Sequence, residues 1–233
     1  MTARLRISVK VLVWAACLSP ILYLARGWLI DELTANPIDY LTDTLGESAL
    51  VLLLASLAMT PIRIVLGVSW PIHFRRLLGL FAFFYVCLHF SMWILVDHFF
   101  NWGQMLEDIV KRPYITVGMT ALTLLAPLAA TSTKAMIRRL GGARWRLLHK
   151  LAYVVAGLAV LHFLWLAKAG VRDPYVYAGV LALLLGIRFW DWSRRRMARL
   201  RPAPAGEPVT PPLGQERAGG RASAPPMLDR SKR

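Results

Sequence analysis

Histidines are the residues of this sequence with the clearest capacity for chemistry. The chain has five, and His89, His149 and His162 lie inside long apolar stretches, whereas His73 and His98 lie in or beside polar connections. A polar side chain at membrane depth is costly, so its default interpretation is functional. Neutral imidazole is the commonest metal ligand, and two histidines on facing helices are what a six-coordinate b-type haem needs.

The spacing of His89 and His162 indicates that they lie at similar depth. His89 is 12 residues beyond Leu77, where its apolar stretch begins, which corresponds to about 18 Å of helix. His162 is 15 residues beyond Leu147, or about 22 Å. If the two stretches run in the same direction, the pair is a candidate for axial ligation of one haem. The alternative is two unrelated histidines, each hydrogen-bonded to a neighbouring helix.

His149 is a candidate for a second or alternative haem site. It lies 13 residues before His162, about 20 Å along a helix, as in membrane cytochromes that hold one haem in each leaflet. Two observations oppose this assignment: 13 residues correspond to a rotation of 220°, and Arg75 and Arg76 occupy the slot where an inner partner on the third stretch would lie. An interfacial histidine among basic residues is the alternative.

The elements that must position these histidines are apolar helices. The chain has 233 residues, 57% of them apolar and 18% charged, with a formal net charge of +15. A soluble protein this basic would suggest nucleic acid, but binders of nucleic acid are rarely so apolar. Stretches of about 20 apolar residues are long enough to span a bilayer. We therefore predict an all-α bundle of six transmembrane helices, at 9–30, 48–66, 77–97, 113–131, 147–167 and 175–193.

The charges between these stretches predict an orientation. Lys and Arg gather before the first stretch, in the second and fourth connections and after the last stretch, whereas nine of the 13 acids lie in the other connections. Cytoplasmic loops of membrane proteins carry the excess of Lys and Arg. We therefore expect both termini in the cytoplasm, no nucleic-acid partner, and an acidic outer connection at 31–47.

Two domains are predicted from composition. Residues 1–200 form the transmembrane domain, and 201–233 form a cytoplasmic tail that holds seven of the 14 prolines and is expected to be disordered. The chain has no C-x-x-C-H, no cysteine-rich iron–sulfur spacing, no G-x-G-x-x-G and no P-loop. Electrons for a redox function would therefore come from a lipid-soluble carrier or from another protein.

Four motifs, taken in order, resemble a known family. They are RRLLGL at 75–80 leading to His89, TSTKAM at 131–136, WRLLHKLAY at 145–153 and HFLW at 162–165. Together with the order of the six stretches they resemble MsrQ, the haem-binding membrane subunits of bacterial periplasmic methionine sulfoxide reductase systems. That family belongs to the wider ferric-reductase-like transmembrane family, and the resemblance covers about residues 8–197.

The resemblance implies a function and its cofactors. Such subunits carry electrons from membrane quinol through b-type haem to a periplasmic molybdopterin-containing reductase, MsrP, where the substrate chemistry takes place. His89, His149 and His162 match the haem-associated histidines, with one haem or two, and the resemblance also implies FMN, at a site that the sequence does not place. Two alternatives remain: a stand-alone haem-dependent ferric or quinone reductase, and a non-redox transporter or scaffold.

Overall fold

The computed structural model describes residues 3–30, 34–166 and 172–200. These residues are helical almost throughout and contain no strand. The elements, in chain order, are α1 (Ala3–Leu29), α2 (Pro37–Leu66), the 3₁₀ turn η1 (Trp70–Phe74), α3 (Arg75–Met92), the π-helical turn η2 (Trp93–Asp97), α4 (Trp102–Lys111), α5 (Pro113–Ala130), α6 (Lys134–Leu140), α7 (Gly142–Leu148), α8 (Leu151–Leu166) and α9 (Asp173–Leu200).

Six helical segments in the described residues are long and apolar enough to cross a membrane, which confirms the predicted fold class. Their bounds are Ile7–Leu29, Pro37–Leu66, Trp70–Asp97, Pro113–Ala130, Gly142–Leu166 and Asp173–Leu200. The fifth segment consists of α7 and α8, which a turn at His149 and Lys150 separates.

The second spanning helix begins 11 residues earlier than the prediction of 48. Asn36 caps it by accepting a hydrogen bond from the backbone N–H of Asp39, and Pro37 fits the first turn because its missing N–H would be unpaired there anyway. Leu45 is buried in the core, whereas the acidic side chains of this segment are exposed. Most of the expected acidic connection at 31–47 is therefore the polar N-terminal end of α2.

A short helix, α4, was not predicted from the sequence. Its ten residues are too few and too polar to resemble a span, but they carry one buried side chain, Met105, and the side chain of Asn101 caps the helix by accepting from the N–H of Gln104. His98 pairs with Asp108 of this helix at 3.2 Å, which joins the end of η2 to α4.

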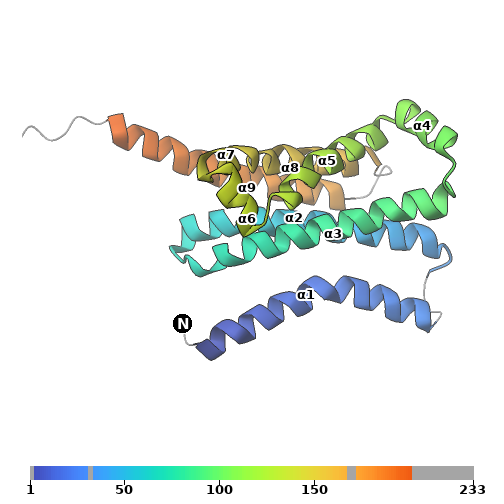
Figure 1. Cartoon of the computed structure of the whole chain (residues 1–233), viewed down its shortest axis with the longest axis horizontal. Helices are drawn as coiled ribbons and strands as arrows, with labels where there is room; N and C mark the ends of the chain where they lie inside the picture. Colours follow the sequence, from blue (N-terminus) through green and yellow to red (C-terminus); the bar gives the residue numbers. More distant parts are fainter. Residues whose placement is uncertain (1–2, 31–33, 167–171, 201–233) are drawn as a thin grey trace, which may run out of the picture. The chain divides into compact units, whose positions relative to one another are not determined.

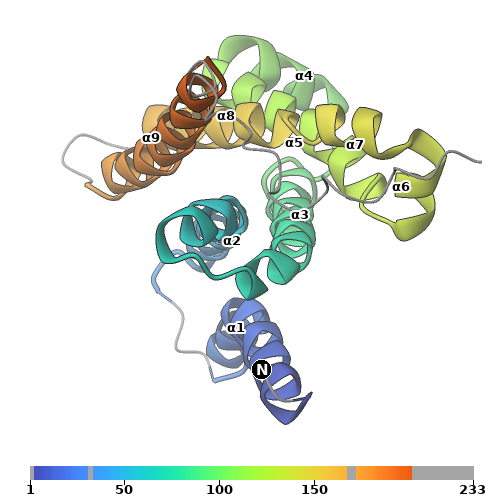
Figure 2. The same cartoon turned by 90° about the vertical axis from the view of Figure 1, so that its left-hand side faces the viewer.

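The core of the bundle consists of two helix pairs. Within the unit Met1–Trp192, α2 packs along α3 and α5 packs along α8, as both Figure 1 and Figure 2 show. Further contacts between α3 and α5 and between α2 and α8 join the two pairs. Ala82, Ala156 and Val155 are almost completely buried at these contacts, because small side chains let helices approach closely.

The hydroxyl of Tyr85 on α3 completes the hydrogen bonding of α1. Pro20 interrupts α1, and Ser19 Oγ donates to the carbonyl of Ala16, which the missing N–H of Pro20 leaves without a helical donor. One step further on, Tyr85 Oη donates to the carbonyl of Cys17 at 2.7 Å and accepts from the N–H of Ile21 at 3.3 Å. Tyr85 is fully buried, so these two hydrogen bonds fix α1 against α3 inside the bundle.

The chain divides into two units, Met1–Trp192 and Ser193–Arg233. Of the second unit the structure describes only the last turns of α9, to Leu200. The predicted tail at 201–233 lies outside the described residues.

Candidate functional site

His89 lies in the last turn of α3 and is held by the neighbouring helix α2. Its Nδ1 is 2.9 Å from the backbone carbonyl oxygen of Thr42. The ring lies directly over Gly46, where an added Cβ would come within 3.0 Å of Nδ1 and 3.1 Å of Cε1. The absence of a side chain at Gly46 therefore makes the space that the imidazole ring fills.

His162 repeats this arrangement in the other helix pair. It lies on α8, and its Nδ1 is 2.7 Å from the backbone carbonyl oxygen of Tyr114 at the start of α5. A Cβ on Gly118 would come within 2.9 Å of Nδ1 and 3.0 Å of Cε1. In both pairs the glycine follows the residue with the accepting carbonyl by four positions, so the same local arrangement is used twice.

These hydrogen bonds determine which ring nitrogen is available to a ligand. A carbonyl oxygen can only accept, so Nδ1 carries the hydrogen in both histidines. The lone pair is then on Nε2, the nitrogen directed away from the supporting helix. Metal-bound histidines in proteins almost always donate their other ring N–H in this way, which fixes the tautomer and orients the ring.

The structure brings the two imidazole rings together at a distance that fits axial ligation of a haem. Their centroids are 6.4 Å apart and their planes meet at 82°. A bond between imidazole nitrogen and a metal is about 2 Å long. If both imidazoles bound one metal, their nitrogens would lie about 4 Å apart, and the observed centroid separation is compatible with that arrangement.

The donor set also favours a haem over a bare metal ion. Among the described residues, no group of three or more His, Cys, Asp or Glu side chains converges on a point. Protein sites for bare zinc use three or four such ligands. Two histidines alone are the axial set of a metal whose other ligands belong to a cofactor, as in b-type haem.

His149 lies elsewhere, at the break between α7 and α8. Its Nδ1 is 3.1 Å from the carbonyl oxygen of Trp145 in its own helix, and its Nε2 is 3.5 Å from Ser132 Oγ. The ring stacks on the Trp145 indole, with centroids 3.9 Å apart. Trp145 in turn donates from Nε1 to the carbonyl of Thr131 at 3.0 Å. The break also means that His149 and His162 do not share one continuous helix, as the predicted rotation of 220° assumed.

The remaining histidines have local partners. His98 packs on Trp93 with centroids 4.6 Å apart and pairs with Asp108, and His73 Nδ1 is 3.0 Å from the carbonyl oxygen of Trp70. Sequence reasoning missed two residues of this site, Gly46 and Gly118. Each is an isolated glycine inside an apolar helix, and such a glycine is a signal that another group approaches the backbone closely.

Comparison with known proteins gives consistent similarities. Residues 45–160 match the family model described as the ferric reductase like transmembrane component. The chain is 50% identical over 194 residues to the protein-methionine-sulfoxide reductase heme-binding subunit MsrQ of Rhodospirillum rubrum, covering 83% of this chain and 93% of that relative.

Two further relatives have the same description. The MsrQ subunit of Herminiimonas arsenicoxydans is 48% identical over 191 residues, covering 80% of this chain and 87% of the relative. That of Caulobacter vibrioides is 46% identical over 183 residues, covering 78% and 87%. The similarity thus extends across nearly the whole length of each relative.

Proposed function

Because this chain belongs to the MsrQ family of heme-binding subunits of protein-methionine-sulfoxide reductase, we propose that it is a membrane electron-transfer subunit. It passes electrons from membrane quinol through b-type haem to a periplasmic, molybdopterin-containing reductase of the MsrP type. That partner repairs methionine sulfoxide in oxidised envelope proteins. The site for the substrate is on the partner, so this chain supplies an oriented cofactor and no catalytic residue of its own.

The pairing of His89 with His162 is the observation that carries the proposal. The two rings come from different helix pairs, and each is fixed by a backbone carbonyl and by a glycine that gives it room. When bound between them, a haem supplies a one-electron carrier. The part of the protein is to hold both imidazoles in the tautomer that presents Nε2, with little movement between oxidation states.

A second or alternative haem site at His149 stays a prediction. Its Nε2 faces the hydroxyl of Ser132, and its ring stacks on the indole of Trp145. FMN is likewise proposed from the family resemblance alone. We propose no more specific flavin site.

The proposed location is the bacterial inner membrane, with both termini in the cytoplasm. The basic residues of α6, α7 and the end of α9 support this orientation, because Lys and Arg accumulate on the cytoplasmic side. His89 and His162 then lie in the outer half of the bilayer, nearer to a periplasmic partner. The lipid bilayer surrounds the apolar side chains that α1 and α9 expose.

The first experiment tests the haem itself. The full chain is purified in detergent, and reduced-minus-oxidised spectra and the haem content per chain are measured. We expect a six-coordinate b-type spectrum that is lost in His89→Ala and in His162→Ala. The matched control is His98→Ala, which removes a half-buried histidine of the same bundle without touching the pair. A wild-type protein without haem would disprove the proposal.

The second experiment separates the proposed partner from the alternatives. Quinol-reduced protein is mixed with a periplasmic molybdoenzyme of the MsrP type or with ferric chelates, and haem reoxidation is followed. Reoxidation by the enzyme supports the proposal, whereas reoxidation by ferric chelates alone supports a stand-alone reductase. Unchanged cellular function after substitution of all three span histidines would indicate a non-redox transporter or scaffold instead.

A further inference from the structure

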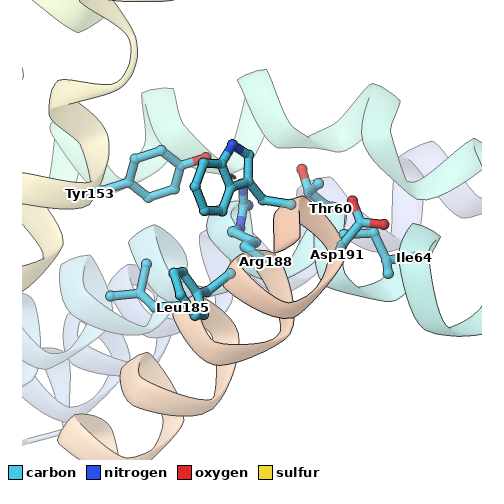
Figure 3. Close-up of a pocket in the computed structure, with 8 residues that line it drawn as sticks. Thr60, Ile64, Tyr153, Leu185, Arg188 and Asp191 are labelled. Carbon is cyan, nitrogen blue, oxygen red and sulfur yellow. Dashed lines mark hydrogen bonds between the residues drawn. The ribbon is translucent and has the colours of Figure 1, made fainter. Parts of the chain in front are cut away.

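A pocket at the other end of the bundle from the histidine pair has an unusual side chain in its wall. It is lined by α2, α8 and α9 and has a volume of about 340 Å³ (Figure 3). Its lining residues are Thr60, Ile64, Tyr153, Leu185, Arg188, Phe189, Asp191 and Trp192. All of them belong to the unit Met1–Trp192.

Arg188 is an ionisable residue inside a membrane-spanning segment, where such residues are rare and mark functional sites by default. It is held in place by two neighbours: it donates to the hydroxyl of Tyr153 on α8 and to the carbonyl oxygen of Leu57 on α2. The guanidinium carbon also lies 5.0 Å from the centroid of the Tyr153 ring. The charge is thus fixed where three helices meet.

The bonding of this arginine is incomplete in a way that points to an occupant. Its Nε is buried and has no hydrogen-bond partner among the described residues. Tyr153 accepts from Arg188 at its oxygen, so its own O–H is still a donor. A group that brings an oxygen acceptor to this end of the pocket would compensate these donors, because an unpaired buried donor costs free energy.

The rest of the lining selects the kind of occupant. Leu185 and Ile64 give aliphatic walls, and Phe189 and Trp192 give aromatic ones that are 67% and 53% exposed on the side of the bundle that faces lipid. Figure 3 places Tyr153 on one side of Arg188 and Thr60 with Asp191 on the other. Asp191 adds a carboxylate to the lining, and a carboxylate oxygen can accept a hydrogen bond from a hydroxyl.

We propose that this pocket binds the ring of a lipid-soluble quinone, an inference that rests on the proposed function. A quinone ring has an oxygen at each end of a flat apolar body. One oxygen would accept from Arg188 and Tyr153, and in the quinol form the opposite hydroxyl would donate to Asp191. The tail stays in lipid, beside Phe189. The volume lies at the lower end of the range of small-molecule pockets, which suits a single substituted ring.

The position of the pocket also suits an electron donor. Tyr153 precedes His162 by nine residues on α8, so the pocket lies about 13 Å along the helix axis from the histidine pair. The basic last turns of α9 follow Trp192 directly, which places the pocket at the membrane interface, where quinone rings can meet both lipid and protons.

The test measures binding without enzymatic turnover. The haem-loaded full chain is placed in lipid nanodiscs, and the binding of a decyl-substituted benzoquinone and of a short-chain naphthoquinone is followed by calorimetry. We expect saturable binding of at least one probe, weakened about 10- to 100-fold by Arg188→Gln, which removes charged hydrogen bonds. Trp192→Leu should weaken it about 3- to 10-fold by removing an aromatic wall.

Matched variants keep the result interpretable. Trp190→Leu is the control for Trp192→Leu, because the two side chains lie on the same helix with 54% and 53% exposure but only Trp192 lines the pocket. If Arg188→Gln does not fold, Thr60→Val and Trp192→Leu test the same pocket from two other helical positions. Haem content and size-exclusion behaviour report folding in every variant.

Three outcomes would overturn the assignment. The first is that neither probe binds to the wild type. The second is that the Arg188, Thr60 and Trp192 variants bind the probe as tightly as the wild type. The third is that anionic phospholipid in the nanodisc displaces the probe, which would assign the pocket to a lipid headgroup. If the wild type contains no haem, the proposed function fails. If haem is present and quinol-reducible but binding ignores these substitutions, only this inference fails.

Discussion

His162 on α8 and His149 in the turn before α8 differ in which helix provides the hydrogen-bond acceptor for the imidazole ring. His162 is held by another helix, through the carbonyl of Tyr114 and the space over Gly118, and its ring centroid lies 6.4 Å from that of His89. His149 is held by its own helix, through the carbonyl of Trp145 four residues earlier, and its Nε2 meets a hydroxyl. One ring is oriented across an interface, whereas the other completes a local helix end.

This difference shows what distinguishes a ligand histidine from a structural one inside a membrane bundle. Both are half-buried, and both bond a backbone carbonyl through Nδ1. The pair His89 and His162 has in addition a glycine beneath each ring and a second imidazole opposite. A support from a different helix orients Nε2 into a shared space, and the predictions below test that distinction.

The largest effect is expected from filling the space beneath the rings. In Gly118→Ala and Gly46→Ala the added Cβ would lie 2.9 Å and 3.0 Å from Nδ1 of the supported histidine. The ring has to move, so haem affinity should fall about 10- to 100-fold, as for other groups that orient metal ligands. The measurement is haem transfer to apomyoglobin.

Gly157→Ala is the matched control for both glycine variants. It lies on α8, the helix that carries His162, but an added Cβ there has nothing within 4 Å. It should keep its haem and gain slightly in stability, because alanine favours a helix interior. Equal haem loss in all three variants would contradict the role of the two supported positions.

The next effect concerns the stability of the bundle rather than the ligands. Tyr85→Phe removes the hydroxyl that donates to the carbonyl of Cys17 and accepts from the N–H of Ile21. The free energy of unfolding should fall by about 1–3 kcal/mol, with an unchanged haem spectrum in the folded protein. Thermal unfolding in detergent measures it, with Tyr175→Phe, which is 70% exposed, as the control.

A smaller effect is expected beside His149. Trp145→Phe removes the hydrogen bond to the carbonyl of Thr131 and changes the stacked ring. We expect a loss of about 1 kcal/mol in stability and no change in the haem spectrum. A shift of the haem spectrum or potential in this variant would show that His149 and its neighbours contact a haem.

The smallest effect on haem is expected from His149→Ala itself. Because Nδ1 bonds its own helix and Nε2 faces Ser132, the His89–His162 haem should remain, with the same spectrum. Quantitative haem analysis per chain is the measurement. A fall from two haems to one would assign His149 to a second site, and complete loss would mean that it ligates the single haem.

The six spans and the proximity of His89 to His162 could be predicted from the sequence, for physical reasons. The lengths of the apolar stretches predict the spans, and counting residues along helices that run in the same direction predicts that His89 and His162 meet. The start of α2 was predicted too far along the chain, because Asp39 and Asp43 interrupt the apolar pattern. The helix in fact begins at Pro37, directly after its cap at Asn36.

Other features depend on tertiary contacts that no local pattern contains. The missing side chains at Gly46 and Gly118 can be recognised as functional only when a histidine from another helix is seen to lie over each glycine. The same holds for Arg188, whose partners Tyr153 and Leu57 are far away in sequence. Helix α4 was missed because one apolar face on ten residues resembles an ordinary connection.

The contact between Tyr85 and α1 has a consequence for biogenesis. During synthesis α1 enters the bilayer well before α3, so the hydrogen bonds that the carbonyl of Cys17 and the N–H of Ile21 make with the α3 hydroxyl form only when the third span arrives. Hydrocarbon offers no substitute for that partner. The first helix should therefore remain near the translocation machinery, or retain water at its break, until the third arrives, so that Tyr85 acts as a checkpoint for the order of assembly.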